Sequence, residues 1–246
     1  MAPRKFPTTT TALILIGTLV ISSCTLKLPF NPVNPVQSEF NLAKGTSWIY
    51  SESDYQPAPG DPTQVVTAQF QITETVTETS STHGVFYAHV QSEEKPIQVP
   101  AEVPANYFPF SPSGDFWYRI QGRQVFQSGG PADFTTEDTD TLPLAFDFPL
   151  SVNHSWCPVR IDLKNPNHPR VTNCDNGGKL TVLQQSTHQV PAGKFENCFQ
   201  IEEFANDGPL FQWFCKDIGM VEIDYDHNGT RFGFKQVLTV YDPGSR

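Results

Sequence analysis

Gln64 to Thr79 reads QVVTAQFQITETVTET, and the pattern of this stretch decides the fold class. Its apolar side chains Val66, Ala68, Phe70 and Ile72 recur at every second position. Successive side chains of a β-strand point to opposite faces of a sheet, whereas an amphipathic helix repeats every 3.6 residues. The stretch is therefore predicted to be a strand with one apolar face.

The same short alternation recurs along the chain, in segments rich in β-branched and aromatic residues that turn residues separate. It is found at 84–91, 115–121, 178–187 and 195–204. Two more such runs, MVEIDYD and TRFGFKQVLTVY, flank Asn228-Gly229, a pair typical of two-residue hairpin turns. The sequence has no window of a dozen residues with a helical apolar period. It therefore predicts an antiparallel, all-β fold.

Two long segments carry few strand signals and are predicted to be loops. Residues 95–113 are rich in proline, and residues 129–150 change from acidic to apolar. Long loops in a compact domain are usually functional covers or mobile excursions. Their apolar tips predict that both loops pack onto another part of the protein. The candidate ligand-binding side chains in these loops are Tyr107, Phe108, Phe110, Phe146 and Phe148.

The N-terminus has the organisation of an export signal. Arg4 and Lys5 precede an apolar core at 12–21, which is too short for a membrane-spanning helix of about 20 residues. The junction Ile21-Ser-Ser-Cys24 resembles a bacterial lipobox, in which Cys24 receives a diacylglycerol thioether. The alternative is an ordinary signal peptide that happens to contain a cysteine. We expect an exported protein, lipid-anchored to a bacterial membrane and facing the periplasm or the cell exterior.

The rest of the chain is predicted to be a tether followed by one domain. After the signal peptide at 1–23, the Pro-rich residues 24–38 form the tether, and residues 39–246 form a single β-rich domain. A Leu followed five residues later by Ser-Trp occurs twice in this domain. This weak echo suggests two similar β units, at about 39–145 and 146–246.

The chain is acidic, with 26 Asp and Glu against 16 Lys and Arg and a net charge of −10. Removal of residues 1–23 takes away Arg4 and Lys5 and no acid, so the mature protein is more negative still. Binding to nucleic acid requires clustered Lys and Arg side chains that neutralise phosphates. The sequence contains no basic run, and nucleic acid is excluded as a partner.

The four cysteines that follow Cys24 form two pairs with the same spacing. Cys157 and Cys174 flank the turn-forming sequence Lys-Asn-Pro-Asn, and Cys198 and Cys215 flank Ala-Asn-Asp-Gly. In an antiparallel hairpin, each pair would face across its turn. We therefore predict the disulfides 157–174 and 198–215 over the other two connectivities. A zinc site is the alternative, but the sequence has no Cys-x-x-Cys motif.

Four short motifs resemble those of a broad class of uncharacterised bacterial envelope lipoproteins. They are Leu-x-x-Gly-x-x-Trp-x-Tyr at 42–50, Pro-Leu-x-Val-x-x-Ser-Trp at 149–156, Val-Pro-Ala-Gly-Lys-Phe-Glu-Asn-Cys at 190–198 and Ile-Gly-Met-Val-Glu-Ile at 218–223. The paired cysteines depart from that pattern, as does Ala43, where Pro is usual. The resemblance implies a curved antiparallel sheet or incomplete β-barrel, similar to lipoprotein-sorting carriers. Long Pro- and aromatic-rich loops and little helix outside the signal peptide are expected with it.

The sequence lacks the motifs of common catalytic sites, including the nucleophile elbow, His-Glu-x-x-His and the P-loop. Residues 224–229 match the first half of a calcium loop, but Lys235 replaces the Glu required at its twelfth position. A hairpin turn explains this segment better. We predict no metal, no cofactor and no enzymatic activity. Acidic groups that a glycosidase could use, or that could simply be solvated, are Glu93-Glu94, Glu202-Glu203 and Glu137-Asp138-x-Asp140.

These features favour a non-enzymatic binding module for an apolar ligand, such as a lipid or an acyl chain. A curved sheet presents one apolar face, and aromatic-rich loops can cover its mouth. The alternative is a structural or partner-binding scaffold in an envelope complex, with the interior filled by the domain's own side chains. An enzyme such as a glycosidase is the third hypothesis. The expected partners are the lipid membrane through Cys24, an apolar small molecule or lipid, and an envelope protein.

Overall fold

The computed structural model describes residues 35–82, 84–101, 103, 107–108, 114–128, 143–160, 171–172, 178–205 and 208–244 of the 246-residue chain. Contacts divide the chain into two compact units, Met1–Pro32 and Val33–Arg246. The predicted lipid-attachment site, Cys24, belongs to the first unit and lies outside the described residues. Within the described ranges, no helix has the length and apolar character needed to span a bilayer.

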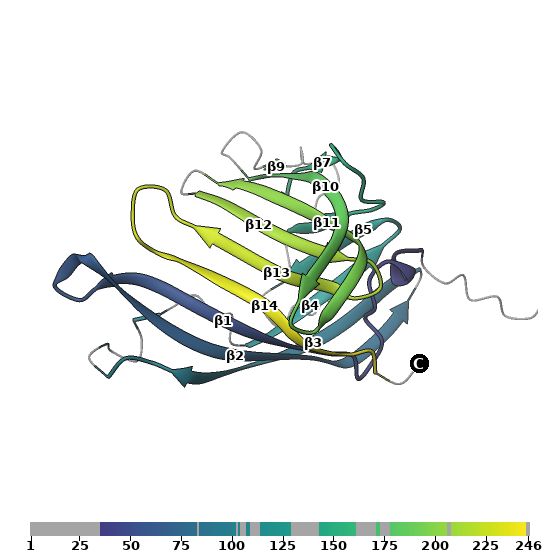
Figure 1. The fold of residues 1–246 in the computed structure, drawn as a ribbon. Coiled ribbons are helices and arrows are strands. Elements are labelled where there is room, and N and C mark those ends of the chain that lie inside the picture. The colour runs from purple at the N-terminus through teal and green to yellow at the C-terminus, as the bar shows by residue number, and fades with distance from the viewer. Residues whose placement is uncertain are drawn as a thin grey trace, which may run out of the picture. The chain divides into compact units, whose positions relative to one another are not determined.

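Twelve strands of the second unit form one antiparallel sheet (Figure 1). Its first half contains β1 (Ser47–Ala58), β2 (Asp61–Thr82), β3 (Val85–Gln98), β4 (Gly114–Gln121), β5 (Gln124–Ser128) and β6 (Leu144–Asp147). Its second half contains β7 (Ser155–Trp156), β10 (Lys179–Val190), β11 (Gly193–Ala205), β12 (Gly208–Cys215), β13 (Gly219–Asp226) and β14 (Gly233–Asp242). A separate two-stranded sheet contains β8 (Val159–Arg160) and β9 (Val171–Thr172).

Each half of the large sheet is a meander, and β1 and β14 join the halves. The spatial order is β6-β5-β4-β3-β2-β1-β14-β13-β12-β11-β10-β7. The sheet curls into a nearly closed barrel with one unsealed seam, and β6 and β7 are its two edge strands. No α-helix occurs among the described residues. The architecture confirms the predicted all-β, incomplete barrel.

Alternation along the strands separates an inner face from an outer face. On β1 the even-numbered residues Trp48, Tyr50, Glu52 and Asp54 are buried, and their odd-numbered neighbours are more exposed. The same parity holds on β2 from Ala68 to Val76, as the period of two predicts. The inner face therefore carries the core. It also carries two buried acids, Glu52 and Asp54.

The segment before β1 packs into this core. A single 3-10 turn, η1 (Pro35–Ser38), places Val36 in a buried position within the stretch predicted to be a tether. Phe40 follows and meets Phe214 edge to face, with ring centroids 5.4 Å apart. A Cβ on Gly219 would lie 2.6 Å from the Phe40 ring, so only glycine leaves Phe40 in its place.

The motif Val190 to Cys198 forms the hairpin between β10 and β11. Val190 pairs with Gly193, so Pro191 and Ala192 make a two-residue turn. The Ala192 N–H donates a hydrogen bond to the Leu238 carbonyl (3.1 Å). The tip of the curved hairpin therefore reaches β14 (Figure 1).

One predicted disulfide is confirmed by its pairing register. Cys198 and Cys215 face each other on β11 and β12, with an S–S distance of 2.01 Å. The register continues to the end of the hairpin, where Ala205 pairs with Gly208 at the predicted turn. Cys157 is also disulfide-bonded. Its predicted partner, Cys174, lies outside the described residues.

Three strand boundaries differ from the sequence prediction. β3 continues through Pro96 to Gln98, inside the first predicted loop. The neighbouring β4 pairs with β3 only as far as Ser92, so Pro96 has a strand on one side alone, where proline is tolerated. β6 lies inside the second predicted loop as an edge strand. Finally, β13 and β14 pair only to Asp226 and Gly233, and a six-residue loop replaces the predicted two-residue turn.

Candidate functional site

A cavity of about 570 Å³ lies on the inner side of the sheet and borders its seam. Leu144 and Phe146 of β6 line it, as does Pro158, which follows β7. Other strands of both halves complete the wall. The volume falls within the range of roughly 300–1,000 Å³ typical of small-molecule sites.

The cavity reaches the surface beside the start of β4. Gly114, Asp115 and Pro143 line it and are exposed. Asp115 Oδ2 lies 3.1 Å from Nε2 of His89, so the acidic group at this rim has a basic partner.

Most of the wall is aromatic and aliphatic. The rings are those of Phe40, Trp48, Tyr50, Phe116, Tyr118 and Phe146, and the aliphatic side chains include Leu144, Leu180, Met220 and Ile223. The Trp48 indole N–H donates to the Ile218 carbonyl (2.7 Å), and the Tyr50 hydroxyl donates to the Met220 carbonyl (3.1 Å). These bonds hold the two β1 rings against the β13 segment and occupy their polar groups.

The polar side chains of the wall are acids and amides. They are Glu74, Asp115, Gln127, Glu203, Gln212 and Gln236. Among the described residues that line the cavity, none is Lys, Arg or His. The described part of the wall therefore brings no positively charged side chain to the cavity.

Glu74 is the acid held within the aromatic wall. It lies opposite Trp48 on β1 and opposite Ser92 on β3. Burial, and then the charge of Glu52, raises the pKa of Glu74 from 4.5 to about 7. Burial, and then the charge of Glu74, raises the pKa of Tyr118. Glu74 itself makes no hydrogen bond or ion pair with any described residue.

Two further carboxyl groups occupy the same inner face. Glu52 lies opposite Gln236 on β14, Asp54 follows two residues later, and each is only 1% exposed. Burial, and then the carboxyl groups of Glu52 and Glu94, raises the pKa of Asp54 from 3.8 to about 8. At neutral pH this face retains protons that solvated carboxyl groups would have lost. Within the described ranges, no group of three His, Cys, Asp or Glu residues is placed to hold a metal ion.

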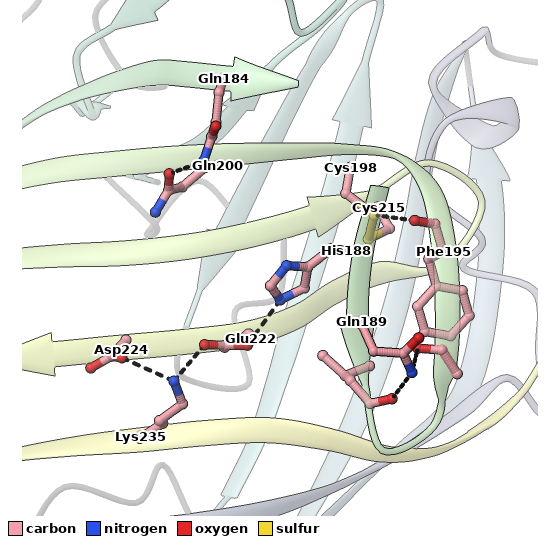
Figure 2. A network of polar contacts seen from close by, with 12 residues as sticks. Gln184, His188, Gln189, Phe195, Cys198, Gln200, Cys215, Glu222, Asp224 and Lys235 are labelled. Atoms are coloured by element: carbon pink, nitrogen blue, oxygen red, sulfur yellow. Dashed lines mark hydrogen bonds and ion pairs between the residues drawn. A yellow bond between two sulfur atoms is a disulfide. The ribbon is translucent and has the colours of Figure 1, made fainter. Parts of the chain in front are cut away.

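The outer face of the second half carries a compensated acid (Figure 2). His188 of β10 stacks on Trp213 of β12, with ring centroids 4.1 Å and planes 12° apart. The Glu222 carboxylate lies 2.9 Å from His188 Nε2 and 2.6 Å from Lys235 Nζ. Lys235 Nζ also lies 3.2 Å from the Asp224 carboxylate. Burial alone would raise the pKa of Glu222, but the hydrogen bonds from Lys235 and His188 outweigh it and lower the pKa.

The first half of the sheet repeats the His–Trp stack. His89 of β3 lies against Trp117 of β4 with the same separation, 4.1 Å, and the same interplanar angle, 12°. The His89 ring also contacts the Thr77 hydroxyl at 2.9 Å and Asp115 at 3.1 Å. Each stack thus places a histidine between a tryptophan and a carboxylate. Trp117 and Trp213 alternate with inward residues of their strands, and two register shifts in β10 lie between the inward Val182 and His188, so both stacks belong to the outer face.

The aromatic residues predicted to bind a ligand are divided between two places. Phe146 lines the cavity and contacts Phe214, with ring centroids 4.9 Å apart. Phe148 is buried beside Phe146 (5.9 Å) but does not line the cavity. Both therefore belong to the main core, and one of them also contributes to the cavity wall.

Tyr107 and Phe108 belong to a second, smaller apolar cluster. Phe108 meets Phe70 of β2 edge to face at 6.3 Å, and the Tyr107 hydroxyl donates to the Pro57 carbonyl (2.7 Å). This part of the predicted loop covers the inner face away from the cavity. Phe110 lies outside the described residues. Because Phe108 is buried, it offers no exposed aromatic surface to a partner protein.

Three important cavity residues, Trp48, Tyr50 and Glu74, were not predicted from the sequence. The parity that predicted an inward Ile72 also places Glu74 inward, two residues later. Alternation in β1 does the same for the two aromatic residues. The sequence therefore contains the information that each of these side chains points inward. The pairing of the strands is needed to show that the three side chains line one cavity.

Comparison with known proteins finds solved structures that share a low sequence identity with this chain. No family model and no curated protein matches the chain. The chain is similar to a candidate lipoprotein from Parabacteroides distasonis ATCC 8503, with 13% identity and a TM-score of 0.46, over 82% of this chain and 97% of that one. It is also similar to a candidate exported protein with a YmcC-like fold from Bacteroides fragilis NCTC 9343, with 14% identity and a TM-score of 0.42, over 83% and 98%.

A third similar structure is a candidate outer-membrane lipoprotein-sorting protein domain from Vibrio parahaemolyticus. It has 7% identity and a TM-score of 0.20, over 80% of this chain and 85% of that one. Identities below 15% and TM-scores below 0.5 carry no functional argument for this chain. Its function has to be argued from its own cavity and side chains.

Proposed function

We propose that this protein is an envelope lipoprotein that acts as a non-enzymatic binding module for a ligand with an apolar body, such as a lipid or an acyl chain. The observation that carries the proposal is the cavity of about 570 Å³ with its aromatic and aliphatic wall. The exposed rim at Asp115 and Pro143 supplies a route of entry.

The position of the cavity supports a ligand over a filled interior. Small barrels normally fill their interior with their own side chains. Here space remains where β6 and β7 do not pair, and side chains of both edge regions face it. An apolar ligand that enters this space removes apolar surface from water, which stabilises the complex by about 25 cal/mol for each Å² buried. The wall thus favours occupation by an apolar group.

Location outside the cytoplasm rests on the N-terminus and on disulfide chemistry. The lipobox-like junction at Cys24 would anchor the domain, and two or more acyl chains hold a protein stably on a membrane. The Cys198–Cys215 disulfide suits an oxidising compartment. Both features support an envelope protein that meets lipids at the membrane surface.

Glycoside hydrolysis is the second candidate function, because Glu74 combines a raised pKa with a place in the cavity. Glu203 lines the same cavity and could supply the second carboxyl group that such enzymes use. We place this function second because the aliphatic side chains of Leu144, Leu180 and Met220 suit an alkyl chain better than a sugar.

The binding proposal is tested by filling the cavity. The probe is N-phenyl-1-naphthylamine, whose fluorescence rises in apolar sites, added to the full chain carrying Cys24→Ser so that no acyl chain is attached. We expect saturable binding that Ile223→Trp reduces at least about tenfold, because the larger ring occupies the cavity. Val240→Trp is the matched control, since Val240 is 50% exposed and lies outside the cavity wall.

Each result bears on the proposal. Saturable binding that only Ile223→Trp weakens supports a ligand in the cavity. Binding that both variants or neither variant weakens places the probe elsewhere and contradicts it. Absence of saturable binding to the unsubstituted cavity also contradicts it and favours the scaffold hypothesis. Circular dichroism of both variants verifies that the sheet has formed.

A further inference from the structure

We infer that the cavity selects a ligand whose apolar chain ends in an ammonium group, and that Glu74 forms the ammonium site with the rings of Trp48, Tyr50 and Tyr118. The inference rests on the proposed function, because it names the class of ligand for the same cavity. It follows from three properties of the wall: its charge, its unused hydrogen-bond acceptors and its rings.

The first property is an acid without a basic partner among the described residues. Lys, Arg and His are absent from the described residues that line the cavity, and Asp115 is paired with His89 at the rim. Glu74 has no such partner among the described residues. A fatty acid would bring its carboxylate towards Glu74 and be repelled, whereas an ammonium group would supply the missing positive charge.

The second property is a shortage of donors around Glu74. The Trp48 N–H and the Tyr50 O–H are both bound to backbone carbonyls, so neither serves the carboxyl group. Ser92 lies opposite Glu74, is only 7% exposed, and its hydroxyl has no hydrogen-bond partner among the described residues. The Ser92 hydroxyl thus lies on the same face as Glu74 with its hydrogen-bonding capacity unused, an arrangement that costs stability unless a ligand supplies a partner.

The third property is the aromatic surrounding of the carboxyl group. Trp48 lies directly opposite Glu74, and Tyr50 and Tyr118 line the same cavity. All four side chains line the cavity. A cation near aromatic faces is attracted by their quadrupoles, and quaternary ammonium groups are recognised in this way. A carboxylate among three rings therefore matches an ammonium group, while the aliphatic wall accommodates its chain.

The test compares three ligands with the same ten-carbon chain, below their micellar concentrations. Decyltrimethylammonium, decanol and decanoate are titrated by calorimetry into the full chain carrying Cys24→Ser. We expect decyltrimethylammonium to bind roughly tenfold more tightly than decanol, and decanoate to bind most weakly. Glu74→Gln should bring the ratio of ammonium to alcohol affinity close to one. Glu78→Gln, an exposed acid on the same strand, is the control and should keep the ratio.

The outcomes separate this inference from the proposed function. Equal or tighter binding of decanol to the unsubstituted cavity overturns the inference while the binding function stands. An ammonium preference that survives Glu74→Gln also overturns it, since the charge would then be recognised elsewhere. Failure of all three ligands to bind overturns both. Lysophosphatidylcholine shows which kind of ammonium ligand the cavity accepts. If it binds, the class of ligand includes zwitterionic lipids, and if it does not bind, the class is limited to ligands with a net positive charge.

Discussion

Glu74 and Glu222 are the same residue type on one continuous sheet, yet the protein shifts their pKa values in opposite directions. Glu74 faces inward among aromatic rings, and burial raises its pKa to about 7. Glu222 faces outward and is also partly buried, but Lys235 and His188 lower its pKa. Burial therefore does not decide the behaviour of a carboxyl group by itself. The supply of basic partners on its face of the sheet decides it.

The two faces should consequently respond to pH with opposite sign. Asp54 and Glu74 keep protons in the folded state that the unfolded chain releases near pH 4. Their contribution to stability is present at low pH and is lost as the pH rises towards 7 and 8. The pKa of Glu222 is lowered, so its contribution is present above about pH 4.5 and is lost as the pH falls through its folded-state pKa.

The largest effect is expected from Asp54→Asn, which removes the ionisable group from the inner face. Its stability should match that of the unsubstituted chain at pH 4 and exceed it by on the order of 3 kcal/mol at pH 9. The physical reason is that the amide never has to carry a charge beside Glu52. Urea unfolding at intervals from pH 4 to pH 9 measures the difference.

The matched control is Asp224→Asn on the outer face, where the side chain is 43% exposed. This variant should show no gain that grows between pH 4 and pH 8. A pH-independent difference between Asp54→Asn and the unsubstituted chain would contradict the assigned titration. It would also remove the contrast between the two faces.

Side-chain parity is the part of this arrangement that the sequence predicts well. The alternation in 64–79 predicts which face of β2 is apolar, and the same parity carries Glu74 inward. The equal cysteine spacing predicts the register of β11 and β12 down to the turn at Ala205 and Gly208. Both signals are local, because a strand and its hairpin neighbour are close in sequence.

The seam and the cavity could not be predicted in this way. The barrel forms because β1 pairs with β14, a contact between opposite ends of the domain that no local pattern encodes. Phe40 enters the wall from a segment outside the strands, and the two predicted aromatic groups separate into different clusters. The partners of Glu222 likewise come from β10 and β14, so its compensation depends on the completed sheet.

A smaller effect is expected from Glu222→Gln, which removes the acid of the outer network. The free energy of unfolding should fall by about 1 kcal/mol at pH 7, since the hydrogen bonds of Lys235 and His188 lose their charged acceptor. The loss should shrink at high salt and vanish at low pH, where the carboxyl group is protonated in both states. Urea unfolding at two salt concentrations measures it, and a gain in stability at pH 7 would show that burial outweighs the two partners.

The smallest effects are expected from the two histidines that stack on tryptophan. In both His188→Phe and His89→Phe an aromatic ring remains for stacking while the contact with the carboxylate is lost. Glu222 keeps Lys235 at 2.6 Å, so His188→Phe should cost only about 0.5 kcal/mol. Asp115 has no other ion pair among the described residues, but it is 49% exposed, and water can replace His89.

The two substitutions are thus expected to cost little for different reasons, and a double-mutant cycle separates these reasons. Adding Lys235→Met should make His188→Phe more costly, because Glu222 then lacks any basic partner, and should leave the cost of His89→Phe unchanged. Equal costs in both backgrounds would mean that His188 and Lys235 act on Glu222 independently, and that the outer face compensates its acid by two separate contacts.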